Sequence, residues 1–145
     1  MVKTKFTRTS PAAYAEKIGI PPGWFVIRHG LISKKSARRK YTGRWFQISS
    51  DKRTVYRILR FGATVGRDKD SDCERIVIDW DAWLDLYDRE VDVESPMELK
   101  LSPAKFYHFP RLAVSHPDPT VRMAGWLGLT SVCLGILSVV LSFVL

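Results

Sequence analysis

The sequence predicts a mainly β fold, a small barrel or sandwich, with a short N-terminal helix and one C-terminal transmembrane α-helix. Two observations lead to this prediction. Short runs of β-forming residues, separated by turn residues, follow one another from position 24 to 101. The segment 123–145 carries no charged side chain. We expect four parts: a basic arm with a short helix at 1–23, a β-rich domain at 24–114, a Pro-rich linker at 115–121 and a membrane-spanning helix at 122–145.

Charge is unevenly distributed along the chain. Residues 1–60 hold 15 basic and 2 acidic side chains, and residues 61–122 hold 8 basic and 13 acidic ones. Because the remainder is uncharged, the order is basic, acidic, apolar, which excludes an ordinary soluble enzyme domain. A hydrophobic content of 46% excludes a wholly disordered chain. The 2 cysteines form no disulfide framework, which fits a reducing compartment.

The N-terminal part is predicted to be a mobile basic arm followed by a short helix. Residues 1–9 contain three basic side chains and no apolar stretch of the kind that a secretory signal requires. Ser10 and Pro11 suit the N-cap and the first position of a helix, and Gly19 suits its end.

The β-rich domain is predicted from runs of β-branched and aromatic residues. These runs lie at 24–33, 44–49, 54–61, 75–80 and 97–101. In the last run Met97, Leu99 and Leu101 alternate with polar residues, as expected of a strand with one buried face. A hairpin turn is expected at Ser50-Asp51-Lys52, and one or two helical turns are expected at 81–88.

One stretch suggests a particular kind of barrel. Arg75–Val93, RIVIDWDAWLDLYDREVDV, resembles the strand, short helix, strand unit of cradle-loop barrels, which include double-psi barrels. In that unit an apolar strand is followed by an aspartate, a short helical turn, and an acidic turn into an alternating strand. The sequence departs from the pattern at Tyr87-Asp88, where a glycine is usual. The resemblance implies a fold and no activity.

A second resemblance concerns the basic part of the domain. Gly23–Arg60 resembles the opening strands of a pleckstrin-homology domain, although no C-terminal capping helix is visible. Its loop carries six cations in eleven residues, namely Lys34, Lys35, Arg38, Arg39, Lys40 and Arg44. Anionic lipid headgroups, an acidic protein surface and nucleic acid are the possible partners. Lipid is favoured over nucleic acid for a domain tethered at a membrane; the simplest alternative is a solvated loop.

The acidic stretch 68–98 is interpreted as a solvated face or as a docking surface for a basic partner. Its Asp68-x-Asp70-x-Asp72 spacing suits a calcium loop, but Cys73 stands where an EF-hand needs glycine. No catalytic motif is recognised, and we predict no catalytic residue, metal or cofactor. A small membrane-anchored enzyme is a second alternative, which would require Asp79, Asp81 or Cys73 to meet a histidine.

Trp83 and Tyr87 belong to a dense group of aromatic and apolar residues within the acidic stretch. We expect most of that group to lie in the core. If either side chain is exposed, it is a candidate anchor for a protein partner, because large aromatic residues dominate many interfaces.

The uncharged segment Met123–Leu145 is long enough to cross a bilayer. At about 1.5 Å per residue its helix reaches roughly 35 Å, against about 30 Å for the hydrocarbon core. Because it ends the chain, a tail-anchored, single-pass protein is expected. Arg122, with Lys105 and Arg111 upstream, predicts a cytoplasmic N-terminal domain, and Trp126 lies where an interfacial aromatic residue is expected.

Small residues of this helix recur at intervals of four and three residues. They are Ala124, Gly128, Ser131, Gly135, Ser138 and Ser142. The spacing places all six on one face, where small side chains let a second helix approach closely. We interpret this face as a helix-packing seam with left-handed crossing, either for self-association or for a larger membrane complex. Chance spacing is the alternative.

These features together predict a non-catalytic accessory, adaptor or scaffold subunit of a membrane-associated assembly. Its expected partners are membrane lipid, other transmembrane helices and an acidic or basic protein. The first alternative is a module that binds anionic lipid, or nucleic acid, through residues 34–44 at the cytoplasmic membrane face.

Overall fold

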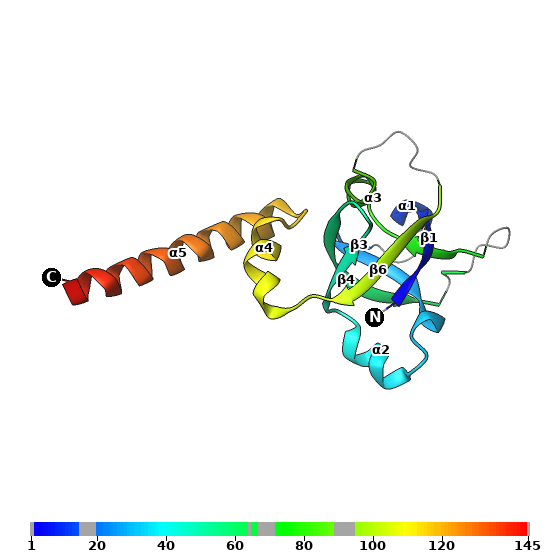
Figure 1. Ribbon diagram of the computed structural model, residues 1–145, viewed down its shortest axis with the longest axis horizontal. Coiled ribbons are helices and arrows are strands. Elements are labelled where there is room, and N and C mark those ends of the chain that lie inside the picture. Colours follow the sequence, from blue (N-terminus) through cyan, green and yellow to red (C-terminus); the bar gives the residue numbers. More distant parts are fainter. Residues whose placement is uncertain (1, 15–19, 64, 67–71, 89–94, 145) are drawn as a thin grey trace. The chain divides into compact units, whose positions relative to one another are not determined.

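The computed structural model describes residues 2–14, 20–63, 65–66, 72–88 and 95–144. The chain divides into two compact units, Met1–Ala104 and Lys105–Leu145. The first unit is mainly β and forms a closed six-stranded barrel with short helices (Figure 1). The second contains one long apolar helix. The predicted fold class is therefore confirmed, with a barrel and not a sandwich.

Most elements of the first unit lie where the sequence predicts them. The strands are β1 (Val2–Thr9), β2 (Trp24–Arg28), β3 (Trp45–Ser49), β4 (Thr54–Gly62), β5 (Glu74–Val77) and β6 (Met97–Pro103). The helical segments are α1 (Pro11–Tyr14), the 3₁₀ turn η1 (His29–Leu31), α2 (Lys35–Tyr41) and α3 (Trp80–Leu86). The predicted helical body at 12–18 lies partly outside the described residues.

The barrel closes in the order β1-β5-β2-β4-β3-β6. The pairs β1/β5 and β2/β4 are parallel, and the other four neighbouring pairs are antiparallel. Ser49 faces Thr54 across the β3–β4 hairpin, which confirms the turn expected at Ser50-Asp51-Lys52. Closure pairs every strand on both sides, so the barrel presents no open sheet edge.

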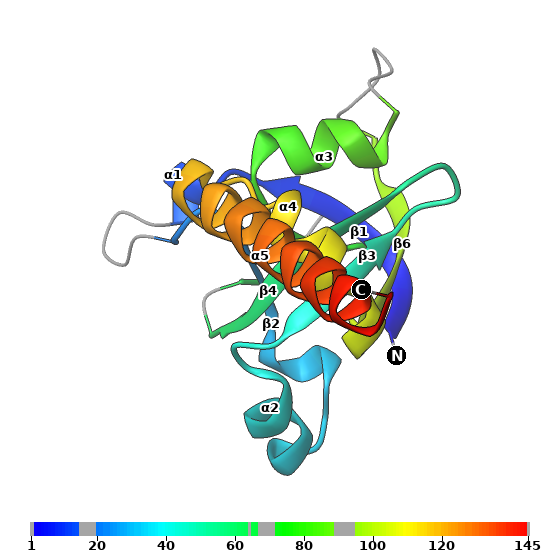
Figure 2. The ribbon, with the colours of Figure 1, turned by 90° about the vertical axis from the view of Figure 1, so that its left-hand side faces the viewer.

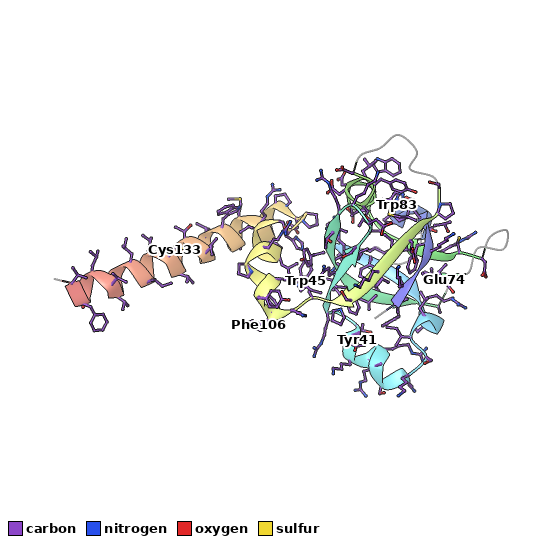
Figure 3. All side chains as sticks on the ribbon, in the orientation of Figure 1. Tyr41, Trp45, Glu74, Trp83, Phe106 and Cys133 are labelled. Carbon is purple, nitrogen blue, oxygen red and sulfur yellow. The ribbon has the colours of Figure 1, made fainter. Side chains whose placement is uncertain are left out.

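The core fills the barrel because alternate side chains of each strand point inward. In β3, Phe46 and Ile48 are buried and alternate with less buried residues. In β6, Leu99 and Leu101 alternate with more exposed residues in the same way. Helix α3 adds Trp83, which is 1% exposed (Figure 3). Helices α3 and α2 lie at opposite ends of the barrel (Figure 2).

The mobile arm predicted at 1–9 is wrong, because Val2–Thr9 form β1. This strand pairs with β5 on one side and with β6 on the other. Phe6 is completely buried, whereas the exposed Lys3 lies 3.2 Å from the Glu98 carboxylate on β6. The three cations of this segment suggest an exposed arm. However, its residues alternate and include several β-branched threonines, a pattern that suits a strand. The β-rich unit thus includes the N-terminal segment.

The basic segment is a helix and not the loop of a pleckstrin-homology-like hairpin. Lys35–Tyr41 form α2, in accord with the good helix propensity of lysine, arginine and alanine. Moreover, β2 pairs with β4 and β5 and is no neighbour of β3. The first strands are therefore not a meander. The segment Arg75–Val93 does contain the expected strand and helix, β5 and α3, but residues 89–94 lie outside the described part.

The second unit consists of three helical segments. The turn η2 (Phe106–His108) leads into α4 (Phe109–Val114), and α5 (Pro119–Val144) follows. The β-rich part therefore ends before residue 114, and the linker predicted at 115–121 is shortened by the early start of α5. Pro119 suits the first turn of a helix because it has no amide hydrogen to leave unbonded there.

Candidate functional site

Helix α5 is long and apolar enough to cross a membrane. It has 26 residues, and its most apolar 18-residue window has a mean hydropathy of 2.3 and is not buried in the protein. At about 1.5 Å per residue the helix measures roughly 39 Å, more than the hydrocarbon core requires. Its exposed apolar side chains make it unlike the core helix of a soluble protein. It is the one such helix in the described part of the chain.

The residues expected at the membrane interface are exposed at the start of the second unit. Lys105, Arg111 and Arg122 are all exposed, and Trp126 is 55% exposed. The aromatic side chains beside them are also uncovered: Phe106 is 83% exposed, and Tyr107 and Phe109 are each 57% exposed (Figure 3). Aromatic rings next to cations are typical of the headgroup layer.

Gly125 is the contact point between α4 and α5. A Cβ atom at this position would lie 2.5 Å from the backbone oxygen of Ala113. Only glycine therefore lets the two helices approach so closely. The sequence prediction of a packing face did not include Gly125, because its neighbour Ala124 fits the regular spacing better.

All six residues of the predicted seam are exposed in the single chain. Apart from the neighbouring backbone of α5, no described atom lies within 4 Å of a Cβ atom built on Gly128 or Gly135. Successive residues of a helix are separated by about 100°. Gly125 therefore points roughly a quarter-turn away from the seam, and the contact with α4 leaves the seam uncovered.

A basic groove lies between α2 and the end of β4. It has a volume of about 450 Å³ and is lined by His29, Lys35, Arg38, Arg39, Thr42, Arg60 and Phe61. Three of the predicted cations line it, whereas Lys34, Lys40 and Arg44 do not. The guanidinium of Arg38 donates a hydrogen bond to the His29 carbonyl oxygen at 3.2 Å.

Sequence reasoning missed three residues of the groove, namely His29, Arg60 and Phe61. They come together because β2 and β4 are parallel neighbours, with Ile27 opposite Phe61. The rings of His29 and Phe61 consequently lie 5.9 Å apart. No local pattern in the sequence reports this parallel pairing.

The structure gives Asp79 a structural role. Arg57 donates to both of its carboxylate oxygens, at 2.8 and 2.9 Å, and the Ala82 amide donates to one of them at 3.1 Å. Burial raises the pKa of Asp79, but the hydrogen bonds and charge of Arg57 outweigh this, so its pKa lies below the ordinary value. Among the described residues, no three His, Cys, Asp or Glu side chains are grouped as metal ligands would be.

The docking role considered for Trp83 and Tyr87 does not fit their surroundings. Trp83 is almost fully buried and closes the core, so it cannot reach a partner. Tyr87 is half-buried, its ring lies tilted against that of Trp83 with ring centroids 5.6 Å apart, and its hydroxyl forms a hydrogen bond with Ser95. The exposed aromatic residue of this region is Trp80, whose ring lies 4.7 Å from the guanidinium carbon of Arg8.

The chain matches no known protein family, and no characterised protein is recognisably similar to it. The geometry of the barrel and of α5 is therefore the basis for a functional proposal.

Proposed function

We propose that this protein is a non-catalytic accessory or adaptor subunit of a membrane-associated assembly, anchored by α5. The observation that supports this most is the uncovered seam. An apolar helix that needed only to hold a domain at a bilayer would require no particular pattern of small residues. In lipid, where hydrophobic driving force is lost, close backbone packing and interhelical hydrogen bonds bring helices together.

The barrel is proposed to lie on the cytoplasmic side. The cations nearest the uncharged segment are Lys105, Arg111 and Arg122, and all of them precede Met123. Positive residues near a span favour the cytoplasmic side. The connection between barrel and helix is short, since 15 residues separate the end of β6 from the start of α5. These span at most about 50 Å at ~3.5 Å per residue, which keeps the barrel near the bilayer surface.

The arrangement suits a protein that holds a partner at a membrane. The seam would pack against another transmembrane helix, of this protein or of a larger complex, while the closed barrel presents a rigid surface. No described cluster in the barrel resembles the nucleophile and base of a catalytic site, and the proposal assigns no chemical step to it.

The test is gentle detergent extraction of the native protein, followed by mass determination of the particle. We expect a stable oligomer or a stoichiometric complex with another membrane protein. A particle containing one copy of this chain and no other protein, in several mild detergents, would contradict the proposal. Sidedness is read independently by protease digestion of sealed vesicles, in which the barrel should be cut only from the cytoplasmic face.

A further inference from the structure

The strongest unassigned feature of the barrel is the basic groove between α2 and β4. Its charged side chains are Lys35, Arg38 and Arg39 from the helix and Arg60 from the strand. They come from segments that are distant in sequence, so the groove is a product of the fold and not of one basic run.

The groove cations lack acidic partners within the described part of the chain. Elsewhere on the barrel, Arg28 pairs with Glu74 at 2.6 Å and Arg57 with Asp79 at 2.8 Å. No such pair involves Lys35, Arg38 or Arg39, nor Arg60, among the described residues. Four positive charges around one hollow, with no acidic partner among the described residues, repel one another, and an anionic ligand would relieve that repulsion.

Part of the groove is preorganised. Arg38 is half-buried, and its hydrogen bond to the His29 carbonyl oxygen holds the guanidinium at the groove wall. Arg60 is also half-buried, on a strand that is paired on both sides. Planar guanidinium groups match the oxygens of a phosphate in a bidentate manner. The rings of His29 and Phe61 add a wall that suits the ring of a headgroup.

Nucleic acid fits this surface less well. Proteins that bind single strands stack successive bases on a series of exposed aromatic rings, and the groove offers one such place, at His29 and Phe61. Tyr41, the aromatic residue of α2, packs edge-on against Phe46 with ring centroids 5.6 Å apart and thus belongs to the core side of the helix (Figure 3). A hollow of about 450 Å³ lies in the size range of pockets for one small ligand, such as a headgroup.

We propose that this groove binds the phosphomonoester headgroups of anionic membrane lipids, with Arg38 and Arg60 as the principal phosphate contacts. The phosphate-binding site itself does not depend on the proposed membrane anchoring. Only the identification of membrane lipid as the source of the phosphate rests on it. A barrel tethered within about 50 Å of a bilayer meets headgroups at a high effective concentration, so a weak intrinsic affinity is enough. The same phosphate chemistry is offered by soluble inositol phosphates, and the experiment separates the two sources.

The test uses the full-length protein in neutral detergent micelles, titrated with fluorescent short-chain phosphatidylinositol 4,5-bisphosphate. Loss of one guanidinium–phosphate contact weakens binding about tenfold. We therefore expect Arg38→Gln/Arg60→Gln to weaken binding by tenfold or more. The matched control, Lys34→Gln/Arg44→Gln, removes the same charge from outside the groove and should change affinity less than threefold. Equal losses in both variants would show diffuse attraction and overturn the site.

A second pair keeps the test valid if Arg38→Gln/Arg60→Gln disturbs folding. Lys35 and Arg39 are exposed groove residues, so Lys35→Gln/Arg39→Gln should leave the thermal unfolding midpoint unchanged while weakening binding more than the control does. Unchanged binding in this folded variant would contradict the proposal.

The lipid source is tested in nanodiscs that carry the full chain. Amide hydrogen exchange of α2 should slow with phosphatidylinositol 4,5-bisphosphate in the bilayer, but not with phosphatidylserine of equal total charge. If added soluble inositol trisphosphate slows exchange and the lipid does not, membrane headgroups are the wrong ligand. Neither the lipid experiment nor the inositol trisphosphate experiment depends on the seam. A negative result in both would therefore leave the adaptor proposal intact, because that proposal is tested by the mass of the extracted particle.

Discussion

Arg57 and Asp79 form a bidentate ion pair that joins β4 to the start of α3. The Arg57 side chain is 10% exposed and that of Asp79 is 32% exposed, so solvent screens this pair only partly. The Asp79 carboxylate also caps α3 through the Ala82 amide. The Asp79 carboxylate thus binds the buried guanidinium of Arg57 and also caps α3, the helix at one end of the barrel.

The first prediction concerns acid stability. Because the pKa of Asp79 is lower in the folded than in the unfolded protein, where it is about 3.9, the unfolded chain binds the extra proton first. The stability from this group is complete above about pH 5 and is lost as the pH falls through the folded pKa. Urea unfolding of the full-length protein in micelles should show this decline, and Asp79→Asn should reduce its slope. An unchanged slope would contradict the assignment.

The second prediction concerns the same carboxylate at neutral pH. Asp79→Ala leaves Arg57 largely buried without its partner and removes the helix cap, so we expect a loss of about 2–4 kcal/mol in unfolding free energy. Asp81→Ala, on the exposed side of the same helix turn, should cost less than about 1 kcal/mol. Equal effects of the two substitutions would show that the ion pair is unimportant.

The third prediction concerns the contact between α4 and α5. Gly125→Leu places side-chain atoms where the Ala113 backbone lies, so α4 must move away. Amide exchange of residues 109–114 should then become faster. Gly128→Leu is the matched control, because no atom other than the neighbouring backbone of α5 lies within 4 Å of its Cβ position. Similar protection in both variants would mean that α4 is held by other contacts.

The fourth prediction concerns the seam. Gly128→Leu/Gly135→Leu fills two uncovered positions and should dissociate the oligomer or complex found after extraction. Leu137→Phe/Val140→Phe adds comparable bulk on the opposite face of α5 and should leave the particle mass unchanged. Intact assembly in the glycine double variant would mean that the small-residue spacing arose by chance.

The fifth prediction concerns the thiols. Cys133 is exposed and lies near the middle of α5 (Figure 3), whereas Cys73 is buried in the first unit. In permeabilised membranes a charged maleimide should label neither, because lipid shields one thiol and the core the other. Labelling should follow unfolding in SDS, while Thr120→Cys, in the first turn of α5, should react without it. Rapid labelling of native Cys133 would place α5 outside the bilayer.

Several elements were predictable because their signals are local. The β3–β4 hairpin follows from two β-forming runs around Ser50-Asp51-Lys52, and the helical turns expected at 81–88 correspond to α3. Strand β1 was missed because Lys3, Lys5 and Arg8 suggest solvent exposure. Their neighbours on the strand become buried only when β5 and β6 lie on either side.

Some features of the candidate sites were likewise predictable from local sequence, and others depended on tertiary contacts. By itself, the sequence determined the apolar helix, the spacing of its small residues and the presence of a basic segment, since these depend only on the order of residues in one stretch. Only the tertiary structure decided that Trp83 belongs to the core, that Asp79 is held by Arg57, and that Arg60 and His29 join α2 in one groove. The reason is that burial and pairing depend on strands distant in sequence, and the parallel pairing of β2 with β4 has no local signature.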